Sequence, residues 1–591
     1  MLPGAIAPGR VQAKLGFAKV LQGAFPAVLR IFFTRLRNSK RCIRKFPIAS
    51  DGRRSGRGCG AVLPLLLRHA RLAGVPAGIS RACETNREIA RAMSLIELPS
   101  PDPAVLDARE QIVRDLIGIC GDAAVISDED GRRTFETDAL TAYRRMPLAV
   151  VLPTSTEDVA AVLKYAKANG IKVVPRGAGT SLCGGALPAE DAIVLGVSKM
   201  NRVLELDYQN RFARVEAGIT NLAISAAVAE EGFFYAPDPS SQLACTLAGN
   251  LAMNSGGAHC LKYGVTTNNV LGVKLVTMDG EVVEIGGSYL DAEAYDLLAL
   301  IVGSEGQFGI ITEATVRILR AAEGARPMMI GFETSAKAGI CVARIIASGI
   351  IPVAIEFMDK PAIEVCEAFA KAGYPTDVEA LLIIEVEGSE QEIVDRLAYI
   401  ASIAHELNPQ ALVVSASDEQ SAKIWKGRKS AFGAIGRLAD YYCMDGTIPL
   451  GHLPYVLEEI SAICARNGLR VANIFHAGDG NLHPLIMYDA NSPGEIEKAE
   501  RAGAEVLKLC VSVGGCLTGE HGVGIEKRDL MRAQFTDEDL AVQLRIKAVF
   551  DPDWLLNPGK VFPLDAVERA MAETDPVARR REAAAGPAEA A

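Results

Sequence analysis

The order of apolar and polar positions predicts alternating strands and helices from about residue 147. A continuous apolar run over 148–152 is typical of a buried strand, and Ser155-Thr-Glu-Asp158 resembles a capping box that begins a helix. Apolar residues recur at helical spacing until Gly170 ends this helix. A second apolar run over 171–174 then completes a β-α-β start.

The alternation continues over residues 326–564. Apolar strands are expected at 328–332, 353–357 and 381–386, with helices between them. This rhythm predicts an α+β domain of the ferredoxin-like type. The preceding segment, 93–146, is typical of short helices.

Length and cysteine content limit the possible classes. A chain of 591 residues suggests three or so domains, and it has no run of eighteen uncharged apolar residues, so a spanning helix is not expected. The 13 cysteines form no Cys-x-x-Cys pair, which argues against an iron–sulfur ligand set within this chain. Scattered thiols fit a reducing compartment, so we expect a cytoplasmic protein.

Charge is distributed unevenly. Residues 1–92 contain 18 Lys/Arg and 3 Asp/Glu, whereas the rest of the chain is strongly acidic, which makes nucleic acid an improbable partner. Three interpretations of the basic segment compete. The first is a transit peptide, which would imply a mitochondrial location, and the second is a surface-binding arm. The third is an artefact of an early start codon, because a normal globular composition begins at Met93. Residues 565–591 are expected to be disordered or a frayed helix.

A glycine-rich loop follows the second strand. Pro175-Arg-Gly-Ala-Gly-Thr-Ser181 is neither a Walker A loop nor a Rossmann fingerprint. Its backbone N–H groups can still close on a pyrophosphate, with donors from Arg176, Thr180 and Ser181. A plain turn explains one such loop equally well.

Further small-residue loops favour a ligand. They lie at 246–250, 254–257, 263–264, 303–306 and 309–310, between strand-like runs. Close packing at tight turns explains one or two of them, but the whole set indicates many backbone segments around one large polyphosphate ligand.

Two histidine motifs near the end of the chain are candidates for chemistry. His476 and His483 flank a glycine-rich turn between apolar runs, which predicts a hairpin that brings the imidazoles to one face. In Gly519-Glu-His-Gly522, Glu520 can supply an oxygen ligand to a metal and leave His521 free as a base. The alternative is a glycine-rich loop whose histidines satisfy backbone carbonyls.

Together these motifs resemble a known family. Val174–Ser181, Asn254–Gly257, Gly303–Gly306 and the two histidine motifs are similar to those of FAD-linked 2-hydroxyacid dehydrogenases of the vanillyl-alcohol oxidase superfamily, over about 147–563. Within that family the chain resembles the flavin subunits of bacterial glycolate oxidases, through Trp425-Lys-Gly-Arg-Lys429 and the segment 441–447.

The resemblance implies a fold and a cofactor. Residues 147–325 would form a PCMH-type FAD-binding domain of two α+β subdomains, followed by a substrate cap over 326–564. FAD would be bound non-covalently, because the glycine loop contains no histidine to anchor it. The implied cofactor-binding residues are Arg176, Gly177, Ala178, Gly179, Thr180, Ser181, Gly249, Asn250, Gly256, Gly257, Gly264, Gly309, Ile310 and Asn557.

The resemblance also implies the chemistry. His476, His483 and Glu520 would bind a divalent metal, Zn or Mn, that stabilises the substrate alkoxide, and His521 would be the general base. Arg428 would hold the substrate carboxylate, although a solvated helix residue is the plainer interpretation because lysines flank it. The hydride would pass to the flavin.

Substrate and partners are expected from the same likeness. Phe432, Cys443 and Leu485 stand where D-2-hydroxyglutarate dehydrogenases carry polar groups, so an apolar wall should favour a short acid, glycolate or D-lactate. Electrons would pass to an iron–sulfur subunit and a second flavin-domain subunit, through which the protein would associate peripherally with the inner membrane. The alternatives are a D-lactate dehydrogenase that uses quinone or cytochrome, a D-2-hydroxyglutarate dehydrogenase, and a non-catalytic flavin-binding scaffold.

Overall fold

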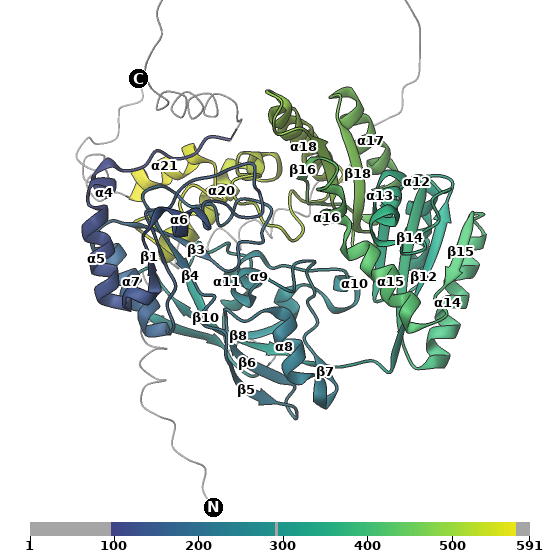
Figure 1. Ribbon diagram of the computed structural model, residues 1–591, viewed down its shortest axis with the longest axis horizontal. Helices are drawn as coiled ribbons and strands as arrows, with labels where there is room; N and C mark the ends of the chain where they lie inside the picture. The colour runs from purple at the N-terminus through teal and green to yellow at the C-terminus, as the bar shows by residue number, and fades with distance from the viewer. Residues whose placement is uncertain (1–95, 290–293, 575–591) are drawn as a thin grey trace, which may run out of the picture. The chain divides into compact units, whose positions relative to one another are not determined.

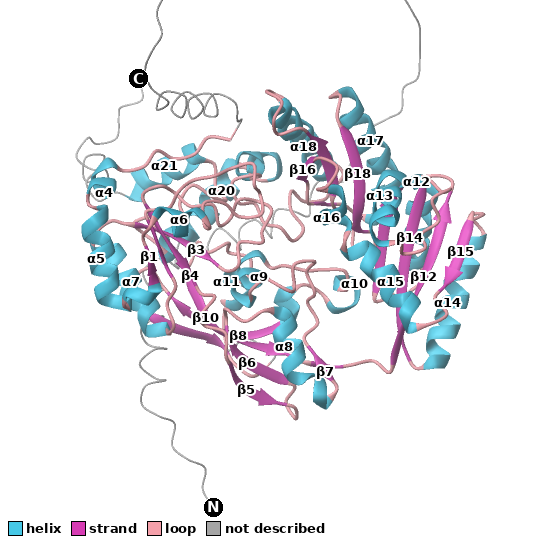
Figure 2. Cartoon of the chain, viewed as in Figure 1, coloured by secondary structure: helices cyan, strands magenta, loops and turns pink. Residues whose placement is uncertain are grey.

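The computed structural model describes residues 96–289 and 294–574. The predicted basic extension, 1–92, and residues 575–591 of the predicted tail lie outside this range. Within the described residues no helix combines the length and apolar character needed to cross a bilayer. Figure 1 labels the elements, and Figure 2 distinguishes helices from strands.

The first described segment contains the expected short helices. They are α4 (Pro103–Asp107), α5 (Arg109–Cys120) and α6 (Glu129–Arg133). Ile112 and Leu116 of α5 are buried against α7 (Thr156–Ala168) and the sheet beside it. This segment therefore belongs to the core of the domain that follows it.

The first sheet has the strand order β1-β2-β4-β3. Its strands are β1 (Val125–Ile126), β2 (Ala149–Val151), β4 (Ala192–Gly196) and β3 (Lys172–Arg176). Strands β2, β4 and β3 are parallel, and α7 connects β2 to β3. The Ser155 side chain caps α7 by accepting from the Asp158 N–H at 3.1 Å. The predicted β-α-β start is confirmed.

The second sheet is antiparallel, in the order β5-β6-β10-β8-β9. These strands are β5 (Val203–Asp207), β6 (Phe212–Glu216), β10 (Ile310–Arg317), β8 (Val270–Val276) and β9 (Val282–Gly286). The short elements among them are α8 (Asn221–Val228), α9 (Leu247–Met253), α10 (Cys260–Tyr263), α11 (Leu298–Ile301) and the paired strands β7 (Phe233–Phe234) and β11 (Leu319–Arg320).

A third sheet forms the second half of the chain. Its first part has the order β15-β12-β14-β13, all antiparallel, built from β12 (Gly324–Phe332), β13 (Ala354–Asp359), β14 (Ala380–Gly388) and β15 (Ala411–Val414). The helices α12 (Ser335–Ala347), α13 (Lys360–Ala370) and α14 (Glu390–His405) follow β12, β13 and β14. This order confirms the predicted ferredoxin-like arrangement.

The same sheet continues through β18 (Arg470–His476), which pairs with β13. Around it lie β16 (Asp440–Cys443), β17 (Gly446–Thr447), β19 (Asn481–Leu482) and β20 (Pro484–Tyr488). The remaining helices are α15 (Asp418–Lys429), α16 (Ala431–Ile435), α17 (Leu453–Arg466), α18 (Glu495–Ser512), α19 (Met531–Gln534), α20 (Asp537–Phe550) and α21 (Leu564–Thr574). Alternate strand residues pack into separate cores on opposite faces, as Phe357 and Met358 show.

The chain returns to the first sheet near its end. The Val173 N–H donates to the Leu555 carbonyl, and the Asn557 N–H donates to the Val173 carbonyl, both at 2.8 Å. These bonds fix residues 555–557 beside β3, the strand that leads into the glycine loop.

Of the two expectations for residues from 565 onward, disorder is wrong for residues 565–574, which belong to the helix α21. Ala566 is buried with Leu544, Trp554 and Phe562, so the helix has an apolar surface to cover. Arg532 donates to both carboxylate oxygens of Asp565 at 3.0 and 2.7 Å. Composition alone did not reveal these contacts.

We expect Phe475→Ala to destabilise the second half strongly. Phe475 and its neighbour Phe357 are fully buried and stacked with ring centroids 4.7 Å apart, so truncation should cost about 3–5 kcal/mol of unfolding free energy. Denaturant unfolding measures the change. Val413→Ala on edge strand β15, 38 % exposed, is the control. Equal losses in both variants would contradict this account of the core.

Candidate active site

A cavity of about 350 Å³ lies where the glycine loops meet the third sheet. The loop after β3, helix α9 and residues 304–311 form one side of it. The second half of the chain contributes Lys429, Phe432, Tyr441, His483, Glu520 and His521. The sequence motifs that were far apart in the chain therefore face one space.

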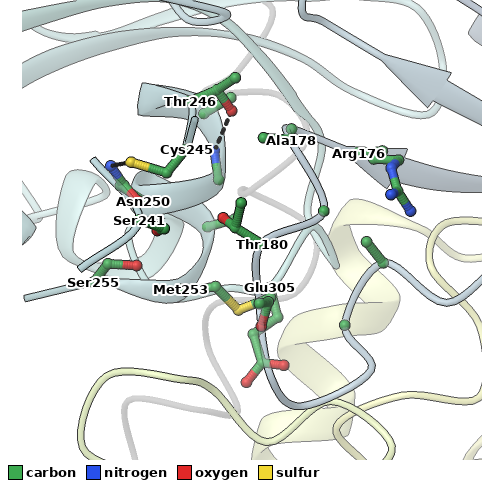
Figure 3. A pocket seen from close by; sticks show the side chains of 18 of the residues that line it. Arg176, Ala178, Thr180, Ser241, Cys245, Thr246, Asn250, Met253, Ser255 and Glu305 are labelled. Atoms are coloured by element: carbon green, nitrogen blue, oxygen red, sulfur yellow. Dashed lines mark hydrogen bonds between the residues drawn. The ribbon is translucent and has the colours of Figure 1, made fainter. Parts of the chain in front are cut away.

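The loop after β3 packs closely on α9 (Figure 3). A Cβ atom on Gly177 would lie 2.3 Å from Thr246 Oγ1. That hydroxyl caps α9 by accepting from the Gly249 N–H at 3.3 Å. Gly179 has φ +71°, a conformation that disfavours other residues. The absence of side chains here leaves the backbone itself exposed to a ligand.

Most of the predicted cofactor residues line the cavity. Those observed there are Arg176, Gly177, Ala178, Gly179, Thr180, Ser181, Gly249, Asn250, Gly309, Ile310 and Asn557. Asn557 donates to the Gly185 and Glu305 carbonyls, while its buried Oδ1 has no hydrogen-bond partner among the described residues. An acceptor that the protein leaves unsatisfied beside the glycine loop fits a polar ligand.

Three of the predicted cofactor residues, all of them glycines, do not line the cavity. Protein segments packed against these glycines explain why a side chain is excluded there. The Gly256 N–H donates to Glu520 Oε2 at 3.0 Å. A Cβ on Gly257 would meet the Asp238 carbonyl, and one on Gly264 would meet the Asn268 side chain. Glycine at these positions therefore allows protein segments to pack closely against one another, and a ligand is not needed to explain it.

Arg176 lines the cavity, and its guanidinium packs against the glycine loop, where a Cβ on Gly179 would lie 2.1 Å from Nη2. Nη1 donates to the Thr137 carbonyl at 2.9 Å, and the group lies over the Phe135 ring. In Figure 3 the side chain points away from Thr180 and Asn250. The expected role of Arg176 as a donor toward a pyrophosphate stays a prediction.

The hairpin brings the two histidines together, as predicted, but with a different register. His476 pairs with Asn481 across β18 and β19, so His483 is its diagonal neighbour on the same face. The two imidazole centroids are 5.2 Å apart at an interplanar angle of 82°. Gly480 takes φ +79° in the turn between them.

Glu520 reaches both imidazoles. Its Oε1 lies 3.4 Å from Nε2 of His476 and 3.4 Å from Nε2 of His483. Although burial raises the pKa of the Glu520 carboxyl, His476, His483 and His521 together lower it to about 2. Ligand atoms of the three predicted metal residues all lie within 4.8 Å of one another. The arrangement is one that a single cation can bridge.

Glu356 is a buried neighbour of this cluster that the sequence did not reveal. Its Oε1 binds Nδ1 of His476 at 2.7 Å, and Oε2 accepts from Arg428 Nε at 2.7 Å. Burial would raise the Glu356 pKa, but Arg428 and His476 hold it at about 2. A carboxylate behind a ligating histidine fixes its ring orientation. The register of β13 against β18 sets this pair, since Glu356 lies opposite His476.

Arg428 is 3 % exposed, is absent from the cavity lining, and pairs with Glu356. The plainer interpretation, a solvated helix residue, is therefore wrong. The expected role of Arg428 toward the substrate carboxylate stays a prediction. Its neighbour Lys429 is the residue of this helix that reaches the cavity.

Asp445 is a second residue that sequence reasoning missed, although it lies in a quoted motif. Its fully buried carboxylate accepts from the N–H groups of Gly519, Glu520 and His521 at 3.0–3.1 Å. Lys527 Nζ lies 3.1 Å from its Oδ2. One carboxylate thus fixes the backbone from which Glu520 and His521 project.

The two glycines of the bend at 519–522 have different roles. Gly522 has φ +90°, whereas the need for glycine at 519 is steric, because a Cβ there would lie 2.4 Å from Asn481 Oδ1. Glu305, itself at φ +52°, accepts from the Val523 and Gly524 N–H groups at 2.7 and 2.8 Å. The loop is held from both halves of the chain.

His521 lies beside the candidate metal ligands. Its ring stacks on that of His483 with centroids 4.8 Å apart and an angle of 18°. Nδ1 is buried and has no hydrogen-bond partner within the described part of the chain. Burial, partly opposed by Asp445, lowers the His521 pKa to about 4. The lowered pKa favours the neutral ring, which can accept a proton.

Of the three residues predicted to form an apolar wall of the cavity, one lines it. Phe432 lines the cavity with Tyr441, and its ring centroid is 6.5 Å from that of His483. Cys443 and Leu485 are buried in a core cluster instead. Tyr441 was quoted in a motif without a role, so its position is new.

Comparison with known proteins identifies the family. Residues 147–286 match the FAD binding domain family, and 322–561 match the C-terminal domain of FAD linked oxidases. The chain is 48 % identical over 430 residues to glycolate oxidase subunit GlcD of Escherichia coli (strain K12), which covers 73 % of this chain and 86 % of that relative. The chain belongs to the FAD-linked oxidase family. It is an FAD-linked oxidoreductase, as its sequence predicted.

Other relatives agree with this assignment. GlcD of Bacillus subtilis (strain 168) is 36 % identical over 79 % of this chain and 99 % of its own length. A D-lactate dehydrogenase of Archaeoglobus fulgidus is 33 % identical over 74 % and 96 %. Among solved structures, 4-ethylphenol oxidase from Gulosibacter chungangensis shares the fold, with TM-score 0.66 and 16 % identity over 80 % of this chain and all of that one. This FAD-linked oxidase therefore has the expected PCMH-type fold.

We expect Gly177→Ala to weaken FAD binding about tenfold, because overpacking the contact with Thr246 Oγ1 at 2.3 Å costs ~1–3 kcal/mol. The ratio of flavin to protein absorbance after dialysis measures the loss. Gly118→Ala in α5 is the control, since its added Cβ meets nothing within 4 Å. Full flavin retention in Gly177→Ala would show that the cradle tolerates a side chain.

Proposed function

We propose that this protein oxidises a short 2-hydroxyacid, glycolate first and D-lactate next. The observation that carries the proposal is the convergence of His476, His483 and Glu520 beside His521, at the wall of the cavity that the glycine loops form. A scaffold that only bound flavin would need no such cluster. The relatives named glycolate oxidase and D-lactate dehydrogenase support the same substrate class.

The candidate ligand set fits a divalent cation. Nε2 of His483 is buried without a hydrogen-bond partner among the described residues, and its neighbouring oxygens are 3.4 and 3.5 Å away. Two nitrogens and one carboxylate oxygen suit Zn or Mn. Such a cation would supply Lewis-acid stabilisation of the substrate's hydroxyl oxygen as its proton is removed.

His521 is then the base. Its ring, with an unpartnered Nδ1, can take the hydroxyl proton, while Asp445 accepts the His521 N–H and Glu305 accepts that of Gly524 in the same loop. FAD held in the glycine cradle supplies the acceptor of the hydride from the α-carbon. Phe432 and Tyr441 restrict the space beside the metal ligands, which favours a short acid.

Arg428 and Glu356 lie beside the candidate metal ligands and do not line the cavity. Arg428 neutralises Glu356, and Glu356 holds the His476 ring through Nδ1, so Nε2 is directed at Glu520. We therefore assign Arg428 a positioning role.

We further propose that electrons leave through partner subunits. The relatives named GlcD are subunits of glycolate oxidase, and this chain offers no Cys-x-x-Cys ligand set for a cluster of its own. An iron–sulfur subunit and a second flavin-domain subunit would fill that role. A D-lactate dehydrogenase that delivers electrons to quinone or cytochrome by itself is the second candidate, and the Archaeoglobus relative named D-lactate dehydrogenase supports that substrate.

Anaerobic titration of the flavin absorbance tests the function. Glycolate, D-lactate, L-lactate and D-2-hydroxyglutarate are added separately, before and after a chelator. Bleaching by glycolate or D-lactate that the chelator abolishes is the expected result. A flavin that stays oxidised with every acid, with and without added Zn or Mn, would refute the proposal.

His521→Ala should retain FAD and metal but lower the rate of flavin reduction by glycolate about 10²–10⁴-fold, because the hydroxyl proton loses its acceptor. Stopped-flow absorbance gives the rate, and metal analysis confirms loading. His405→Ala, exposed at the end of α14, is the matched control. Unchanged reduction in His521→Ala would remove this residue from the mechanism.

Glu356→Gln should weaken metal binding about 10–100-fold, since the amide holds His476 less firmly and leaves Arg428 unpaired. Competition with a metal-sensitive dye measures the affinity. Glu333→Gln, which removes an exposed carboxylate of the same half, serves for comparison. Equal affinities in the two variants would argue against an orienting role for Glu356.

A further inference from the structure

The candidate cation position at His476, His483 and Glu520 has a neighbour of the same chemistry. One ligand atom from each of Asp445, His483 and His521 lies within 4.8 Å of those of the other two. This second set again consists of two imidazoles and one carboxylate, which are donors that suit Zn. We infer that Asp445, His483 and His521 form a second cation position, which overlaps the first one.

The two imidazoles of the second set have ring nitrogens to offer. Nε2 of His483 and Nδ1 of His521 are both buried and lack a hydrogen-bond partner among the described residues. Asp445 Oδ1 lies 3.5 Å from Nε2 of His483. Both histidines line the cavity, so a cation that enters the cavity can reach them. A bound ion would satisfy these buried nitrogen atoms.

The second position should be the weaker of the two. The Asp445 carboxylate already accepts three backbone N–H groups and lies 3.1 Å from the Lys527 ammonium, whose charge repels a cation. The rings of His483 and His521 stack at 18°, and a lone pair lies in the plane of its ring, so one ring must tilt to share an ion. Glu520 Oε1, in contrast, lies 3.4 Å from both of its partner imidazoles. A single cation should therefore prefer the first position.

The two positions exclude each other and differ in their effect on the base. Both Glu520 and Asp445 approach Nε2 of His483, whose one lone pair can bind only one ion. A neutral imidazole has one nitrogen lone pair, so a cation on His521 leaves no acceptor for the substrate's hydroxyl proton. This consequence rests on the proposed function, whereas the second position itself does not. A cation held there keeps the base from acting.

Zinc binding to the Glu520→Gln variant tests the inference. The amide oxygen can still accept the Gly256 N–H, which lies 3.0 Å from Oε2, and only the first position loses its carboxylate. Full-length protein that contains FAD and has been stripped of metal by a chelator is titrated with Zn²⁺ against a metal-sensitive dye. We expect Glu520→Gln to keep a single Zn²⁺, bound about 10–100-fold more weakly than in the unaltered protein.

Second substitutions in the Glu520→Gln variant identify the remaining ligands. His521→Ala should lower its zinc affinity at least about tenfold further, whereas His476→Asn should change it less than about threefold, because only His521 belongs to the second position. The asparagine amide can replace Nδ1 of His476 in the contact with Glu356. His405→Ala, exposed at the end of α14, is the matched control.

The opposite pattern overturns the inference. A loss of zinc with His476→Asn but not with His521→Ala would keep the ion at the first position. A Glu520→Gln variant that binds no Zn²⁺ would show that the second position does not form.

Zinc-edge anomalous scattering from crystals of Glu520→Gln alone gives an answer even where a double variant fails to fold. A peak among Asp445, His483 and His521 supports the inference, and a peak beside His476 refutes it. Neither measurement uses turnover. An unaltered protein that oxidises no 2-hydroxyacid would therefore refute the proposed function while the zinc measurements still decide the second position.

Discussion

The buried carboxylate of Asp445 is the constraint on which the site depends. Three consecutive backbone N–H groups, those of residues 519–521, donate to it, and Lys527 compensates its charge. A charge with no exposed surface persists only when it is paired and hydrogen-bonded in this way. In an extended strand the neighbouring side chains of Glu520 and His521 would point to opposite faces, but in this loop both line the same cavity. Asp445, some seventy positions earlier in the chain, thus holds the conformation of the loop that carries Glu520 and His521.

The same principle operates at His476. Its position is set by strand pairing, and its ring is set by Glu356, which Arg428 neutralises. His476 and the loop that carries Glu520 are thus each supported by a buried charge pair whose members come from distant segments. Removing one member would leave the other charge unpaired in a low-dielectric interior, so these pairs resist drift in the site geometry.

Local patterns predicted what depends on neighbouring residues. The apolar runs and the capping residue Ser155 specified strands and helices, and the glycine turn after His476 specified a hairpin. The glycine loop before Thr180 and the histidine motifs identified the family. Glu356, Asp445 and the engagement of Arg428 could not be read in this way. Their roles arise from pairing across 72 to 120 positions, which no local periodicity records.

Glycines were the least reliable guide. Gly177 and Gly179 do line the cavity, but Gly256, Gly257 and Gly264 are small because other segments press on them. A missing side chain records close approach without saying what approaches. The tail shows the same limit, because Ala566 has an apolar surface to cover that composition cannot reveal.

Glu305 joins the two halves of the chain at a single carboxylate. It belongs to the flavin-binding half, yet it accepts the N–H groups of Val523 and Gly524, next to His521. Ser181 of the glycine loop likewise donates to the His521 carbonyl. A chimaera that joined the flavin half of one relative to the substrate half of another would cut through these bonds. Recombination between relatives therefore keeps these bonds intact when both halves are exchanged together.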